Sequence, residues 1–352
     1  MHLFSPYTLR DVTLRNRLAV SPMCQYSATS KGFATDWHFV HLGSRAVGGA
    51  GLIIVEATGV EPRGRISPSC LGLWSDDHIE SLERIGRFVK EQGAAWGIQL
   101  AHAGRKASTD RGWNGGRPVA PADGGWIPVA PSALAFDDAS PVPDALDEAG
   151  IQEIKTAFID AARRAVAAGF DVVEVHAAHG YLLHQFLSPL TNRREDRWGG
   201  SFENRTRLVR EVTAAVRDVM PERLPLLVRL SATDWVEGGW DVDQTVELSR
   251  GLKGLGADLI DVTSAGLVPN AVMPIGPGYQ TVFAERVRRE AGIASSAVGL
   301  IVSAHQADHV IRTGQADLVM LGRPFLRDPY WPLHAAKELG QTVAWPNQYL
   351  RA

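Results

Sequence analysis

The sequence predicts one α/β domain folded as a (β/α)₈ barrel, with parallel strands enclosed by helices. Short apolar runs alternate with amphipathic stretches from one end of the chain to the other. Each run is almost continuously apolar, which is typical of parallel strands buried on both faces. A doubly wound sheet is the competing fold. It is disfavoured because eight units follow one another without a break in composition and no strand is followed by G-x-G-x-x-G.

The expected elements alternate along the whole chain. A small hairpin at residues 7–9 and 12–14 comes first and is expected to plug one end of the barrel. The strands are expected at Leu18–Ser21, Leu52–Glu56, Trp96–Leu100, Val172–His176, Leu226–Leu230, Leu259–Thr263, Ala297–Gly299 and Leu318–Leu321. The helical patterns fall at Ile79–Gln92, Ile151–Ala168, Phe202–Val219, Gln244–Leu255, Phe283–Ala291, Ser303–Thr313 and Trp331–Leu339. Asp147 and Asp241 supply acidic starts to two of these helices.

Two segments depart from this alternation. Residues 103–144, after the third strand, are rich in Gly, Pro and Trp and are long for a connection inside a compact domain. We expect them to form a capping loop over the C-terminal ends of the strands. Residues 344–352 are polar and lack an apolar period, so they are expected to form a C-terminal arm. No linker divides residues 1–352, which predicts a single domain.

Composition excludes several classes of protein. The 352 residues include 36 Lys plus Arg against 39 Asp plus Glu, which gives no electrostatic reason to bind nucleic acid. The two cysteines, Cys24 and Cys70, lack any C-x-x-C spacing, so no iron–sulfur, zinc or other metal site is expected. No apolar run approaches the ~20 residues that cross a bilayer. The N-terminus does not resemble a secretory signal, and we therefore expect a cytoplasmic protein with no membrane partner.

Polar residues collect at the C-terminal ends of the expected strands, where barrel enzymes place their active sites. Gly299 and the pair Gly322-Arg323 close strands seven and eight, the usual phosphate pocket of this fold. Glycine lets backbone N–H groups approach a phosphate, and an arginine pairs with it bidentately. Ordinary turns with a surface arginine are the alternative. The position on these two strands favours phosphate.

The end of the fourth strand carries His176, His179 and Tyr181 within six residues. These side chains offer hydrogen-bond donors and a source of a proton. The H-x-x-H spacing is also compatible with a metal pair, and core histidines are a third interpretation. Metal is the least favoured of the three because the other strand ends supply no third ligand cluster.

The run from His176 to Pro189 closely resembles the signature of the old yellow enzymes, which are FMN-dependent ene-reductases on a (β/α)₈ barrel. The resemblance continues through residues 192–194 and 196–205 and covers essentially the whole chain. A cysteine at position 24, rather than a threonine, is typical of the thermophilic-like class of this family. The chain resembles that class most.

The resemblance implies an FMN-dependent ene-reductase that uses NADPH or NADH as hydride donor. It implies hydride transfer from the nicotinamide to FMN, and then to Cβ of an α,β-unsaturated carbonyl compound, with protonation of Cα by Tyr181. Substrate contacts are implied for Tyr26, Lys106, His176 and His179. FMN contacts are implied for Ser21, Pro22, Met23, Cys24, Ala57, Gln99, Arg229, Gly299, Gly322 and Arg323. A homodimer or homotetramer is also implied, in which Arg351 reaches a neighbouring subunit's site.

These implied roles have physical reasons. The Arg229 charge stabilises a flavin that becomes anionic on reduction, and the Gln99 amide both donates to and accepts from the pyrimidine ring. His176 and His179 can donate to one carbonyl oxygen. Tyr181 keeps its proton at neutral pH and can release it to carbon. A tyrosine that only packs on the flavin edge, with water as the donor, is the alternative.

Two other functions compete with this interpretation. Dienoyl-CoA reductases and amine dehydrogenases have similar barrels but add an iron–sulfur cluster and a further nucleotide-binding domain. Two cysteines and 352 residues leave no room for either addition. A barrel that stores or senses flavin without turnover is disfavoured by Tyr181 and the paired histidines. Cys24 remains open to two roles, as a group that tunes the flavin potential or as a small buried hydrophobe.

Overall fold

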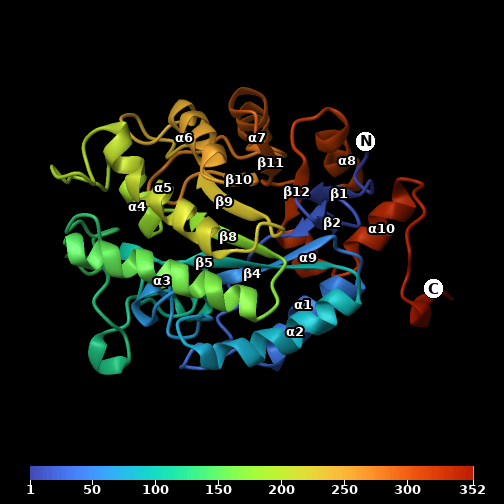
Figure 1. The fold of residues 1–352 in the computed structure, drawn as a ribbon, viewed down its shortest axis with the longest axis horizontal. Helices are drawn as coiled ribbons and strands as arrows, with labels where there is room; N and C mark the ends of the chain where they lie inside the picture. Colours follow the sequence, from blue (N-terminus) through green and yellow to red (C-terminus); the bar gives the residue numbers. More distant parts are fainter. Residues whose placement is uncertain (352) are drawn as a thin grey trace.

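The computed structural model describes residues 1–351 and contains a closed barrel of eight parallel strands (Figure 1). In chain order the barrel strands are β3 (Leu18–Val20), β4 (Leu52–Gly59), β5 (Ala95–Ala101), β8 (Val172–Ala177), β9 (Leu226–Ser231), β10 (Leu259–Thr263), β11 (Ala294–Ala297) and β12 (Leu318–Leu321). Each strand pairs with the next, and β12 pairs with β3 to close the barrel. The predicted fold class is confirmed.

Helices surround the barrel and connect its strands (Figure 1). The longer ones are α1 (Asp36–Val47), α2 (Ile79–Glu91), α3 (Glu148–Ala167), α5 (Phe202–Val219), α6 (Val242–Gly254), α8 (Ala304–Arg312) and α10 (Trp331–Glu338). Shorter ones are α4 (Leu182–Leu187), α7 (Thr281–Arg286), which continues as a π-helical turn at Val287–Ala291, and α9 (Arg323–Arg327). Asp147 and Asp241 cap α3 and α6, as predicted, because each carboxylate accepts a backbone N–H of the first turn.

The N-terminal hairpin closes one end of the barrel. Its strands β1 (Tyr7–Leu9) and β2 (Val12–Leu14) pair antiparallel. Leu9 and Leu14 are buried in one apolar cluster with inward residues of the barrel strands, including Leu52 and Leu227. The predicted plug is therefore present, and it leaves the opposite end of the barrel for the site.

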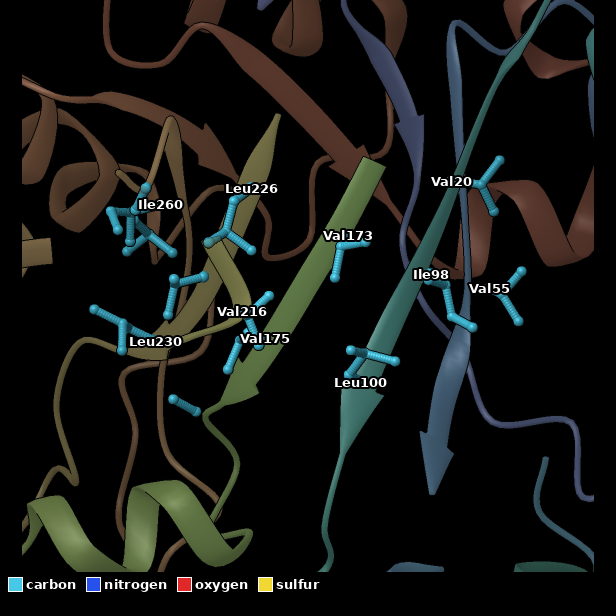
Figure 2. Close-up of a cluster of buried hydrophobic side chains, with 14 of the residues drawn as sticks. Val20, Val55, Ile98, Leu100, Val173, Val175, Val216, Leu226, Leu230 and Ile260 are labelled. Atoms are coloured by element: carbon cyan, nitrogen blue, oxygen red, sulfur yellow. The ribbon is translucent and has the colours of Figure 1, made fainter. Parts of the chain in front are cut away.

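Residues alternate between the two faces of each barrel strand. One face packs against the helices, and Figure 2 shows this layer with Val173 and Val175 of β8 near Val216 of α5. The other face points into the barrel, where β8 places Glu174 and His176. The deepest inward layer is apolar, whereas the layers nearer the C-terminal ends of the strands are polar.

Strand seven and helix α1 differ from the prediction. The strand is β11, Ala294–Ala297, not Ala297–Gly299. Two serines interrupt the apolar pattern of this strand. Their hydroxyls are satisfied inside the fold, because Ser295 Oγ donates to the Ala284 carbonyl at 2.9 Å and Ser296 Oγ donates to Asp261 at 2.6 Å. Helix α1 was not predicted because its buried face carries His38, His41 and Arg45, which break the apolar period.

The two irregular segments lie outside the barrel. Residues 103–144 contain three 3₁₀ turns (Gly104–Lys106, Gly112–Asn114, Pro121–Asp123) and the strand β6 (Val129–Ala130), which pairs with β7 (Asp144–Ala145). The last described segment has a 3₁₀ turn at Asn347–Tyr349 and extends away from the barrel beyond α10 (Figure 1). Within residues 1–351, no helix is both long and apolar enough to cross a membrane.

Candidate active site

The turn between β8 and α4 presents the histidines and the tyrosine. His176 ends the inward face of β8, and Tyr181 occupies the N-cap of α4. His179 and Gly180 between them have positive φ angles of 58° and 72°. A side chain at position 180 would meet the Gly266 carbonyl oxygen at 2.1 Å, so the turn needs glycine there.

Hydrogen bonds from several elements hold this turn in place. The His179 N–H donates to Ser231 Oγ of β9, and the Gly180 N–H donates to His184 Nδ1 of α4, both at 2.9 Å. His184 Nε2 lies 2.9 Å from Asp234 Oδ1, and both side chains are fully buried. Lys106 Nζ donates to the His179 carbonyl at 3.0 Å. The turn is therefore held by β9, by α4 and by Lys106 of the 103–144 segment.

The two histidines and the tyrosine form one compact cluster. His179 Nδ1 lies 3.3 Å from His176 Nε2, and the Tyr181 ring packs edge-on against His176 with centroids 5.2 Å apart. Burial and the nearby Arg229 charge hold the pKa of each histidine well below its usual value. Burial likewise raises the Tyr181 pKa. At neutral pH the cluster therefore holds two neutral imidazoles and a protonated phenol.

A first cavity of about 300 Å³ opens beside this cluster, at the ends of β10, β11 and β12. Gly299, Gly322 and Arg323, which the sequence predicts as a phosphate site, line it together with Arg229. Gly299 has φ 120°, and a side chain there would meet Gln280 Nε2 at 2.7 Å, so the backbone can form this wall only with glycine. Arg323 and Arg327 are exposed in this lining, whereas Arg229 is buried. These residues fit the phosphate of FMN.

The remaining predicted flavin contacts do not line this cavity; four of them follow β3, and the others lie on β4 and β5. Ser21 donates its backbone N–H to the Leu321 carbonyl at 3.0 Å, and Met23 lies near Gly322. The Cys24 thiol contacts the Ala57 backbone and the Tyr26 hydroxyl, and burial raises the thiol pKa. Gln99 is 2% exposed and donates to Glu174 within the barrel, and Pro22 lies between Ser21 and Met23.

A second cavity of about 360 Å³ lies on the other side of the cluster. Tyr181 and Lys106 form its inner wall, and residues of the 103–144 segment, Arg117 and Phe136 among them, form the rest. Lys106 Nζ lies 4.8 Å from the Phe136 ring centroid and 5.1 Å from that of Tyr181. Burial lowers the Lys106 pKa to about 8. The cluster thus contributes to both cavities, because His179 lines the one suited to a cofactor and Tyr181 lines the one enclosed by the loop.

Some functional candidates were missed by sequence reasoning, and several predicted residues, Tyr26 and Arg351 among them, line neither cavity. Thr263, Tyr279, Gln280 and Arg327 line the first cavity. Thr263 ends a correctly predicted strand, so it could have been predicted as a site residue from its position alone. The others lie in loops or on the short α9, where no periodic pattern marks them. Arg351 is exposed on the C-terminal segment and lines neither cavity of its own chain.

Within residues 1–351, His, Cys, Asp and Glu side chains form no group of three that could hold a metal ion. The two histidines of the H-x-x-H motif instead contact each other, and His179 Nε2 lies 3.1 Å from Thr263 Oγ1. Hydrogen bonding to a ligand oxygen is a better use of this pair than metal coordination.

A closed (β/α)₈ barrel with a cavity that fits a phosphate beside a His–His–Tyr cluster is typical of a flavin-dependent oxidoreductase. Comparison with known proteins then gives the family. Residues 2–342 match the NADH:flavin oxidoreductase / NADH oxidase family, and the chain belongs to it. It is a member of the old yellow enzymes and an oxidoreductase that uses FMN and a reduced nicotinamide.

Individual relatives cover nearly the full chain. An NADPH dehydrogenase of Geobacillus thermodenitrificans is 52% identical over 350 residues, which are 99% of this chain and 98% of that protein. The structure of an old yellow enzyme homologue from Zymomonas mobilis is 28% identical with a TM-score of 0.81, covering 97% of this chain and 94% of that one. Morphinone reductase is 30% identical with a TM-score of 0.81, covering 99% and 92%.

Proposed function

We propose that this protein is an ene-reductase that reduces the carbon–carbon double bond of α,β-unsaturated carbonyl compounds at the expense of NADPH or NADH. When bound, FMN would accept a hydride from the nicotinamide and deliver it to Cβ of the substrate. The observation that carries the proposal is the His–His–Tyr cluster itself, in which His179 lines the first cavity, Tyr181 lines the second, and His176 makes ring contact with both.

The two histidines would bind the substrate's carbonyl oxygen. Both are neutral at physiological pH because their pKa values are depressed, so each can offer one N–H. The contact of 3.3 Å between His179 Nδ1 and His176 Nε2 would give way to hydrogen bonds with that oxygen. Such bonds strengthen as negative charge develops on the oxygen, and they therefore favour hydride addition at Cβ.

Tyr181 would supply the proton to Cα. Its raised pKa keeps the hydroxyl protonated, and Lys106 Nζ lies 5.1 Å from the centre of its ring, so a positive charge faces the ring that loses the proton. The proton leaves the phenol oxygen for carbon, and solvent then restores it. Tyr26 and Lys106 complete the substrate side, while Ser21, Pro22, Met23, Cys24, Ala57, Gln99, Arg229, Gly299, Gly322 and Arg323 would hold FMN.

Two segments complete the proposed site. Residues 103–144 would cap it, because they enclose the second cavity together with Tyr181. Residues 344–352 would form an arm that carries Arg351 to a neighbouring subunit of a homodimer or homotetramer.

Anaerobic half-reactions test the proposal. Purified protein should be yellow, should release FMN rather than FAD on heating, should bleach with NADPH and should regain its colour with an enone. A flavin that NADPH reduces but no enone reoxidises would support a store or sensor instead. A panel of enals, enones, maleimides and nitroalkenes, followed by the rate of reoxidation, would then define the substrate class.

A further inference from the structure

Five polar side chains form a buried layer inside the barrel. They are contributed by consecutive strands, β5 to β11, and each is at most 4% exposed: Gln99, Glu174, Arg229, Asp261 and Ser296. Gln99 pairs with Glu174 in the strand register, as Arg229 pairs with Asp261 and Asp261 with Ser296. Glu174 lies two residues before His176 on β8, so both point inward. Arg229 is level with His176 in the β8–β9 register, whereas Glu174 is level with Leu227, one inward position deeper than His176.

Within residues 1–351, Glu174 is the ionisable member of this layer that has no oppositely charged partner. Arg229 Nε lies 2.9 Å from Asp261 Oδ2, and Ser296 Oγ donates to Asp261 Oδ1 at 2.6 Å, so the arginine charge is matched by Asp261. Glu174 Oε1 accepts a hydrogen bond from Gln99 Nε2 at 2.7 Å, but Glu174 Oε2 is buried without a partner in residues 1–351. A buried carboxylate without its own cation is costly in the ionised form.

The groups that face Glu174 explain its protonation. Its titratable neighbours are Arg229 on β9, Asp261 on β10 and His176 on its own strand, while β5 contributes only the Gln99 amide. Burial and the Asp261 charge raise the Glu174 pKa to about 8, against the opposing effects of Arg229 and Gln99. His176 adds no charge, since its own pKa is depressed. Glu174 is therefore a neutral acid at pH 7.

We propose that Glu174 is a positioning residue of the flavin site, which orients the Gln99 amide and couples flavin reduction to the uptake of one proton within the barrel. The inference rests on the proposed FMN site. With one Gln99 N–H engaged by Glu174, the Gln99 carbonyl oxygen is left for a donor on the flavin ring. The residue acts through Gln99 and through its charge, and not by contact with substrate.

The coupling follows from electrostatics at short range in a dry interior. Reduction adds negative charge next to the layer, and this charge disfavours an ionised Glu174. Above pH 8, Glu174 would therefore bind one proton from bulk water when the flavin is reduced. The new Glu174 O–H bond is the only change within the protein, since the two electrons and the hydride's hydrogen come from the nicotinamide. Below pH 8, it is already protonated and adds nothing. Above pH 8, the midpoint potential of the flavin should then fall more steeply with pH than the midpoint potential of a protein that lacks this acid.

The test is the flavin midpoint potential of the holoprotein between pH 6 and pH 10, for the wild type and for Glu174→Gln. The glutamine keeps the hydrogen-bonding shape but does not titrate. We expect the two curves to run parallel below pH 8, with the wild type falling below the variant above it. Ser296→Ala is the matched control: it lies in the same layer and removes a hydrogen bond but no titratable group, so its curve should parallel the wild type. Lys106 also titrates near pH 8 but is common to all three proteins.

A second variant isolates the orienting role. Glu174→Leu leaves the Gln99 amide without its acceptor, and FMN affinity should fall about three- to tenfold, the usual effect of one lost hydrogen bond. Glu174→Gln should retain affinity close to that of the wild type. Equal affinities for all three proteins would refute the orienting role, and parallel potential curves would refute the coupling.

If both variants fail to fold, the wild type alone still decides. Infrared difference spectra on reduction of protein labelled with ¹³C-glutamate should show a protonated glutamic acid at pH 7 whose band shifts, and a gain of that band at pH 9. Absence of such a glutamate signal would overturn the coupling. Failure of the wild type to bind FMN at all would instead overturn the proposed function.

Discussion

The two cavities beside the His–His–Tyr cluster are built in different ways. The first is walled by strand ends and by the backbone that follows them, at Val298–Val302 and Met320–Pro324. The second is walled largely by residues of the 103–144 segment, in which Gly112–Pro118 are exposed to solvent. A wall of strand ends is set by the pairing of the whole barrel. A wall of loop residues depends on a few local contacts, and loops tolerate change more readily.

This contrast suggests a division of labour between the cavities. The first cavity would hold the cofactor that every turnover needs, whereas the second would tolerate change without disturbing the barrel. The His–His–Tyr cluster links them, because His179 lines the first and Tyr181 the second, and the β8–α4 turn that carries both is anchored to β9 and α4 as well as to Lys106 of the loop segment. Substitutions on the two sides should therefore alter different measurable quantities.

The largest effect is expected where the cavities meet. Tyr181→Phe should slow reoxidation of the reduced enzyme by an enone by about 10²- to 10⁴-fold, with water limiting the loss if it can replace the phenol. Reduction by NADPH should stay near the wild-type rate because no carbon is protonated in that half-reaction. Stopped-flow traces at the visible absorption band of oxidised flavin separate the two half-reactions. An unchanged reoxidation rate would remove Tyr181 from the chemistry.

The next effect concerns the first cavity. Arg323→Ala should weaken FMN binding by about 1.5 kcal/mol, roughly tenfold, the lower end for a charged hydrogen bond because Arg323 is exposed and solvent screens it. Fluorescence titration of the apoprotein measures it. Arg289→Ala, on a surface ion pair with Glu285, is a control of equal charge change. Equal affinities for the two variants would place the phosphate elsewhere.

The same contrast explains what the sequence could reveal. Buried parallel strands are apolar on both faces, so six of the eight were located to within one residue at either end, and the strand ends located His176, Arg229 and Gly322. Strand β11 was placed too late in the chain because Ser295 and Ser296 satisfy their hydroxyls inside the fold, which no local pattern reports. The roles of Tyr26 and Lys106 came only from the family resemblance, because loop residues carry no period.

A smaller effect should distinguish the second cavity. Phe136→Ala removes the ring 4.8 Å from Lys106 Nζ and opens the loop wall, so KM for bulky enones should rise about two- to fivefold. FMN affinity should not change, since Phe136 does not line the first cavity. Leu134→Ala, in the same segment but outside the cavity lining, serves as the control. A loss of FMN in the Phe136 variant would contradict the independence of the two cavities.

The smallest effect is expected for the C-terminal arm, whose contacts within its own chain are slight. Tyr349 Oη lies 3.2 Å from Tyr330 Oη, which tethers the segment weakly to the start of α10. Leu350 is 67% exposed. An exposed terminal segment usually frays. If a two-fold partner instead receives it, each subunit lends Arg351 to the other's site, and loss of that one exposed cation should raise KM only about two- to threefold. Arg351→Ala and removal of residues 347–352 should act alike, both without loss of FMN. Steady-state kinetics with NADPH and an enone, alongside sedimentation, would test this: a monomer, or unchanged KM after the deletion, would leave the arm without a role in a neighbouring site.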